Sequence, residues 1–141
     1  MERVEFCKML EDAKHESKMS TIDMVRVFNT YPNDIRRLER GINNSKMSTY
    51  MQYISAVKHA MAIDNNDETF VINDYPGLVQ WALQAMGGGT GYSMAQNHKD
   101  VGFYQTYISF LKKPGHSMTI DKFLALVNKL GCEVRLVKAE G

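Results

Sequence analysis

Apolar residues recur every three or four positions over most of the chain, which is the spacing of one face of an α-helix. In the first half the pattern predicts four helices, over residues of about 4–16, 21–28, 32–40 and 49–61. In the second half it predicts four more, over about 76–86, 94–101, 105–113 and 120–130. A short β-prone segment follows the last helix of each half, near residues 70–72 and 133–137. We therefore expect a mainly α fold in which four helices and one short strand occur twice in the same order.

The last helix of each half shows the repeated pattern best. Its apolar positions are Tyr50, Tyr53, Ile54, Val57 and Met61 in the first half, and Ile120, Phe123, Leu124, Val127 and Leu130 in the second. Either Ser48 or Thr49 is expected to cap the first of these helices, and Thr119 the second. Because a lone short strand is unstable, the two strands are expected to pair, either within one chain or between two copies in a homodimer.

Residues 20–41 carry the signals of two short helices joined by a tight turn. Ser20 is a good cap for the first helix, and Asn29 tolerates the left-handed backbone of a turn. Pro32 has a preset φ that suits the first position of the second helix. Two apolar residues three positions apart, Ile35 and Leu38, are expected to pack that helix against the core, and Gly41 is expected to end it.

This spacing resembles the Cro and phage-repressor family of helix-turn-helix proteins, often called XRE-type. Four positions match the family pattern directly: Ile35, Leu38, Glu39 and Gly41. At two further positions Asn29 replaces the family's turn glycine and Tyr31 replaces its serine. The corresponding places in the second half are held by Gly102, Ile108 and Leu111. The resemblance implies two lambda-repressor-like helix-turn-helix repeats, residues 1–74 and 75–141, each with a short strand.

The second half departs from the family pattern at several positions. Lys112 stands where the family has its glutamate, and Asn97 and His98 stand where small or aliphatic residues are usual. A glycine-rich segment, 87–91, lengthens the entry to its second helix. The second repeat is therefore expected to be divergent, with altered DNA contacts or none.

The resemblance implies a transcriptional regulator that binds duplex DNA sequence-specifically, with one chain presenting two recognition helices as its own pseudo-dimer. In the first half it places Tyr31, Pro32, Asn33 and Arg37 against bases, and Thr21, Arg40, Asn43, Asn44 and Lys46 against phosphates. In the second half it places Tyr104, Gln105, Thr106 and Phe110 against bases, with Lys112, Lys113 and His116 near the backbone. Asparagine can pair with adenine and arginine with guanine, whereas the alternative for each residue is a solvated polar face.

Charge is compatible with DNA binding without demanding it, since the formal net charge is only +1. Residues 1–62 carry 10 basic and 8 acidic side chains, and residues 75–141 carry 7 and 4. Between them, residues 63–74 carry 4 acidic side chains and no basic one, which suggests an acidic linker. Two mildly basic halves are therefore expected on either side of it.

A protein-interaction module is the alternative function, either antitoxin-like or a regulator subunit with a degenerate helix-turn-helix. The low net charge and Phe110 favour this alternative, whereas Arg37, Arg40 and the motif spacing favour DNA.

No constellation of residues points to catalysis, and the four histidines lack ligand spacing, so we expect neither an enzyme nor a metal or other cofactor. The charged N-terminus and the lack of a long apolar run predict a cytoplasmic protein without membrane contact. Cys7 and Cys132 are expected to be buried thiols.

Overall fold

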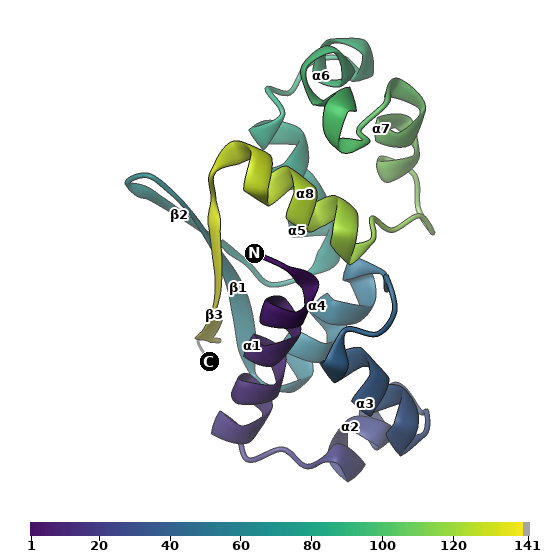
Figure 1. Cartoon of the computed structure of the whole chain (residues 1–141), viewed down its shortest axis with the longest axis vertical. Helices are drawn as coiled ribbons and strands as arrows, with labels where there is room; N and C mark the ends of the chain where they lie inside the picture. The colour runs from purple at the N-terminus through teal and green to yellow at the C-terminus, as the bar shows by residue number, and fades with distance from the viewer. Residues whose placement is uncertain (140–141) are drawn as a thin grey trace.

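The computed structural model describes residues 1–139, and its described elements are eight α-helices, one 3₁₀ turn and three strands (Figure 1). The first half contains α1 (Arg3–Glu16), α2 (Thr21–Phe28), α3 (Pro32–Arg40), α4 (Met47–Ala56) and β1 (His59–Asn65). β2 (Glu68–Ile72) completes the first half, and the second half contains α5 (Tyr75–Ala85), α6 (Gly91–His98), the 3₁₀ turn η1 (Lys99–Val101), α7 (Gln105–Leu111), α8 (Ile120–Leu130) and β3 (Glu133–Lys138). The mainly helical fold class and the strands near 70–72 and 133–137 are confirmed.

The strands form one antiparallel sheet in the order β2-β1-β3. β1 is the central strand, and its residues from His59 to Ile63 are buried. β1 and β2 form a hairpin whose turn contains Asn66 with a positive φ of 55°. The tip of this hairpin projects beyond the helices (Figure 1).

The predicted helix over 49–61 is wrong in its last turn, because α4 ends at Ala56 and Met61 lies in β1. The chain leaves the helix through Lys58, whose φ of 61° is left-handed. Val57 and Met61 continue the helical spacing of Tyr53, so the local pattern favours a longer helix. Pairing along both edges of β1 overrides this local pattern, since strand formation depends strongly on tertiary context.

The predicted N-cap of the same helix is also wrong, because Lys46 rather than Ser48 or Thr49 occupies the N-cap of α4.

Pairing between two copies stays a prediction, but the expected pairing of the strands near 70–72 and 133–137 with each other inside one chain is wrong. Each pairs with β1, which lies between them and was not predicted as a strand. The acidic stretch 63–74 is also not a simple linker, since it forms the end of β1, the hairpin turn and β2. Its Asp64 accepts a hydrogen bond from Arg135 Nε of β3 at 2.8 Å, and this contact holds the pKa of Asp64 below its usual value.

The two halves meet at two backbone joints of matching register. In the sheet Ala62 pairs with Arg135, and outside it Lys46 and Thr119 form an antiparallel bridge. Both pairs are 73 residues apart, since 135 − 62 and 119 − 46 give the same difference. At the bridge the Met47 N–H donates to the Met118 carbonyl at 2.7 Å, and the Ile120 N–H donates to the Ser45 carbonyl at 2.8 Å. The starts of α4 and α8 are thereby tied to each other.

One hydrophobic core runs through both halves. Phe123 of α8 packs edge-on against Phe6 of α1 at a ring-centroid distance of 6.4 Å, and against Trp81 of α5 at 6.1 Å. Cys7 and Cys132 are both buried as free thiols, as the sequence predicted. Burial of this kind across the halves means that neither half carries a separate core.

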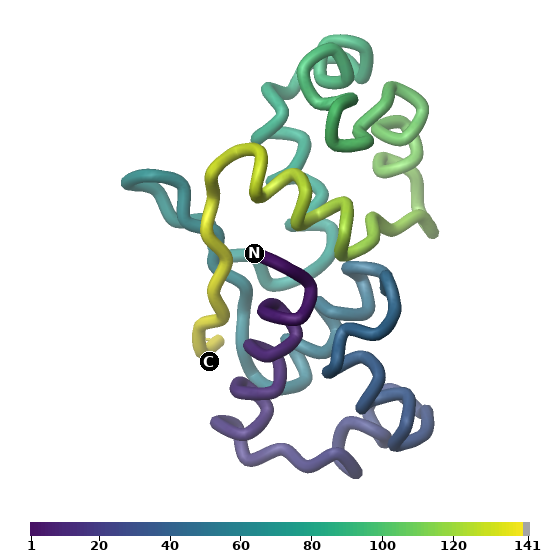
Figure 2. Tube along the Cα trace, in the orientation of Figure 1, coloured from purple at the N-terminus to yellow at the C-terminus, as the bar shows by residue number. Residues whose placement is uncertain are grey.

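The helices are arranged with the α2–α3 pair and the α6–α7 pair at opposite ends of the long axis. Both pairs lie toward the same side of the molecule, and the sheet lies on the other side (Figures 1 and 2). α4 and α8 occupy the middle, where the backbone bridge joins them. The two helix pairs thus flank a shared centre.

A central role for β1 predicts that Met61→Ala lowers the free energy of unfolding of the whole chain by about 2–5 kcal/mol, the usual cost of truncating a buried methionine. Val71→Ala in β2 is the matched control, because Val71 is 57% exposed and a surface change costs about 0.5 kcal/mol or less. Urea denaturation followed by circular dichroism measures both. Equal effects of the two substitutions would contradict the placement of Met61 in the core.

Candidate nucleic-acid interface

The segment from α2 to α3 has the local geometry that its sequence predicts. Ser20 caps α2: its Oγ accepts from the Asp23 N–H at 3.1 Å, and the Asp23 carboxylate accepts from the Ser20 N–H at 2.8 Å. The backbone hydrogen bond from Ser20 lowers the pKa of Asp23. Asn29 is left-handed at φ 48° and ψ 53°, and Pro32 is the first residue of α3. These features fix a short turn between two helices.

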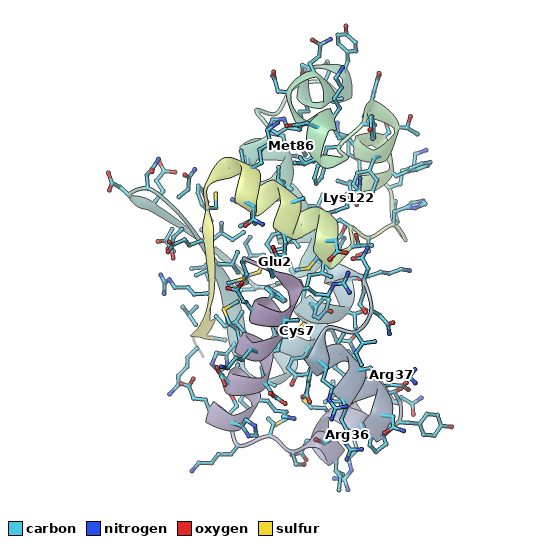
Figure 3. All side chains as sticks on the ribbon, in the orientation of Figure 1. Glu2, Cys7, Arg36, Arg37, Met86 and Lys122 are labelled. Carbon is cyan, nitrogen blue, oxygen red and sulfur yellow. The ribbon has the colours of Figure 1, made fainter. Side chains whose placement is uncertain are left out.

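α3 is seated on the core by one face and exposes the other. Ile35 is 2% exposed, whereas Tyr31 is 76% exposed and Asn33, Arg37 and Arg40 are also exposed. Arg36 and Arg37 extend outward from the helix (Figure 3). Arg36 Nη1 donates to Asn33 Oδ1 at 3.3 Å, so the two side chains lie together on the open surface. The predicted base-facing residues of the first half are therefore gathered on one accessible surface.

A buried polar cluster holds the other end of α3. Lys14 Nζ lies 2.7 Å from Glu39 Oε2, and the Tyr53 hydroxyl donates to the same carboxylate oxygen. All three side chains are buried, and they come from α1, α3 and α4. Burial, and then the neighbouring Glu39 carboxylate, raise the pKa of Tyr53. A buried pair of this kind keeps the C-terminal turn of α3 in one position relative to α1 and α4.

The predicted phosphate contacts of the first half differ in their surroundings. Thr21 is half-buried, and its hydroxyl accepts a hydrogen bond from Lys14 Nζ at 3.5 Å. Asn44 Oδ1 accepts from the Asp121 N–H at 3.1 Å and so helps to cap α8. Asn43 and Lys46 are exposed, and the backbone of Lys46 takes part in the bridge to Thr119. Asn44 therefore has a structural partner that the sequence did not reveal.

In the second half η1 follows α6, and α7 follows Gly102, whose φ of 90° is left-handed. α6 begins three residues before the predicted 94, and η1 occupies the end of the predicted helix. Ile108 is fully buried, whereas Tyr104, Gln105 and Thr106 are exposed on the first turn of α7. The predicted base-facing residues of this half also share one surface. His98 is buried, with its Nδ1 3.0 Å from the Met94 carbonyl oxygen.

An aromatic and basic cluster lies at the end of α7. Phe110 is 41% exposed and stacks on His116 at a centroid distance of 5.1 Å. Lys113 Nζ lies 5.5 Å from the centre of the Phe110 ring, and Lys112 is exposed beside it. This surface therefore combines an apolar ring with positive charge.

Two lysines that the sequence did not single out support the two exposed helices. Lys14 pairs with Glu39, and it is the basic residue on the otherwise apolar face of α1. Lys122 extends from α8 (Figure 3). Its Nζ donates to the Gly102 carbonyl at 2.5 Å and lies 4.7 Å from the centre of the Tyr107 ring. Burial lowers the pKa of Lys122. A basic residue within a buried stripe was the available sequence signal for Lys14.

Comparison of the chain with protein-family models, with curated proteins and with solved structures gives no significant match. Within residues 1–139 no group of three or more histidine, cysteine, aspartate or glutamate side chains is placed to hold a metal ion. Over the same described residues, no helix combines the length and the apolar character needed to cross a membrane.

The buried cluster predicts that Glu39→Gln destabilises the chain by about 3–5 kcal/mol, because the Lys14 charge would remain buried without its partner. Lys112→Gln is the control, since Lys112 lies 73 positions after Glu39 but is exposed, and its loss should change stability by about 0.5 kcal/mol at most. Guanidinium denaturation of both variants tests the difference. A loss below about 1 kcal/mol in Glu39→Gln would show that the ion pair does not hold α3.

Proposed function

We propose that the protein is a transcriptional regulator that binds duplex DNA through two helix-turn-helix repeats, with α3 and α7 as the recognition helices. The observation that carries this proposal is the pair of short helices, each seated on the core by an isoleucine and each exposing polar residues on its first turn. A recognition helix needs this combination of a fixed base and an open face in order to enter a major groove.

A constant offset of 73 residues supports the assignment of two repeats. Adding 73 to Asn29, Tyr31, Ile35 and Leu38 gives Gly102, Tyr104, Ile108 and Leu111. Asn29 and Gly102 are both left-handed, and Tyr31 and Tyr104 are both N-cap residues. The same offset separates the two members of one pair in the β1–β3 ladder, Ala62 and Arg135, and those of the Lys46–Thr119 bridge. Antiparallel pairing of equivalent strands is what a two-fold arrangement of two repeats requires.

The positive charge on α3 supports contact with phosphates despite the low net charge. Arg36, Arg37 and Arg40 are exposed, and among residues 1–139 none of the three forms an ion pair with a carboxylate. Glu39, the acidic residue between them in sequence, points into the core. The exposed surface of α3 is therefore more basic than the composition of the chain suggests.

Electrophoretic shift of random and selected duplexes, at several salt concentrations, tests the proposal. Arg37→Ala should cost about 1–3 kcal/mol of binding free energy and relax the preference at one base position. Arg40→Ala should weaken binding to all sequences and lower the salt slope by about one. Lys8→Ala is the charge-matched control, because Lys8 is an exposed residue of α1 outside both helix pairs.

Unchanged affinity in both Arg37→Ala and Arg40→Ala would contradict DNA binding through α3. An equal loss in Lys8→Ala would show that only overall charge matters, and would also contradict specific binding through α3.

A protein-interaction module is the second candidate, and the exposed Phe110 ring favours it. On that hypothesis Phe110→Ala removes a partner protein that co-purifies with the wild-type chain, because a large aromatic ring is a common anchor of an interface. On the DNA hypothesis the same variant changes only a local base preference. Pull-down with wild-type and Phe110→Ala chains distinguishes the two, and loss of a specific partner without any change in DNA binding supports the second candidate.

A further inference from the structure

The two proposed recognition helices present different chemistry at equivalent positions. With the offset of 73, Pro32 and Asn33 correspond to Gln105 and Thr106, and Arg37 corresponds to Phe110. All of these side chains are exposed. The surface of α3 is thus rich in arginine, whereas α7 offers two small polar donors and an aromatic ring.

These side chains favour different bases. An arginine in the major groove donates two hydrogen bonds to O6 and N7 of guanine, whereas an apolar side chain contacts the methyl group of thymine. Phe110 is held for such a contact, because its ring stacks on His116 and Lys113 lies beside it, where a lysine can meet the adjacent phosphate. Arg37 has no acidic partner among residues 1–139 and extends into the open (Figure 3).

The order of the two helices along a duplex is fixed by the chain itself. The β1–β3 ladder and the Lys46–Thr119 bridge join the halves through their backbones. Arg3 of α1 adds an ion pair with Asp121 of α8, and Arg3 Nη1 also donates to the Gly41 carbonyl at 3.2 Å. Both helix pairs are held toward the same side of the molecule by these contacts (Figure 1).

We infer that one chain recognises a non-palindromic duplex site in a single orientation. In the half-site bound by α3, the base that Arg37 contacts is guanine. In the half-site bound by α7, the base that Phe110 contacts is thymine. This inference rests on the proposed DNA binding and adds the class of site that is bound. The half-sites lie about one helical turn apart, or a multiple of it, as for other paired recognition helices. A second copy of the chain is not needed to complete the site.

Selection of bound duplexes from a random library with the full chain tests the inference, together with the mass of the complex on the selected site. The expected result is an asymmetric consensus of two unlike half-sites bound by one chain. A palindromic consensus bound by two chains would overturn the inference and leave the proposed DNA binding intact. Failure to enrich any sequence over non-specific binding would overturn the proposed function and the inference with it.

Replacement of thymine by uracil in the selected site tests the role of Phe110, because uracil lacks only the methyl group. At the thymine met by Phe110, the replacement should weaken wild-type binding about four-fold, the value of one buried methylene. Phe110→Ala should not respond to it, and Phe110→Arg should select guanine at that position in place of thymine. Arg37→Ala is the matched variant, and it should keep the full response to uracil. A response of Phe110→Ala equal to that of wild type would contradict the assigned contact.

Discussion

β1 lies between β2 and β3 and forms backbone hydrogen bonds along both of its edges. β1 follows α4, the last helix of the first half, and β3 follows α8, the last helix of the second half. Their pairing therefore brings two distant parts of the chain into one sheet. The helices that precede the two strands, α4 and α8, are consequently placed next to each other and share one core. The positions of α3 and α7 at the two ends of the molecule follow from that arrangement, since each packs on the helices of its own half (Figure 2).

In α3 and α7 the residues that hold the helix on the core differ from the residues proposed to meet DNA. Ile35 and Ile108 provide the buried anchors, and the residues proposed to meet DNA take little part in the core. The supports differ between the halves. α3 is fixed by the buried Lys14–Glu39 pair, whereas the turn before α7 is fixed by Lys122 at the Gly102 carbonyl. The supporting contact and the exposed side chains therefore differ between α3 and α7, whereas both helices pack on the core through an isoleucine.

Local signals in the sequence were sufficient for most helices. Ser20, Asn29, Pro32 and Gly41 each act through backbone geometry within a few residues, so their effects could be predicted without knowledge of the fold. β1 could not be predicted, because its apolar residues continue the helical spacing of α4 and become a strand only when β2 and β3 pair with it. The cap that Asn44 gives to α8 was equally hidden, since the two residues it joins are 77 positions apart. For the candidate interface, the exposed residues could be predicted from the sequence, whereas the contacts that hold α3 and the turn before α7 could be seen only in the structure.

One chain is proposed to present two recognition helices to one face of a duplex. Hydroxyl-radical footprinting of a selected duplex, with the chain at a 1:1 ratio confirmed by native mass spectrometry, measures this most directly. Two protected segments are expected on the same face of the duplex, with centres about 10 base pairs or a multiple of that distance apart. One protected segment per bound chain, or no protection at any concentration that shifts the duplex, would contradict it.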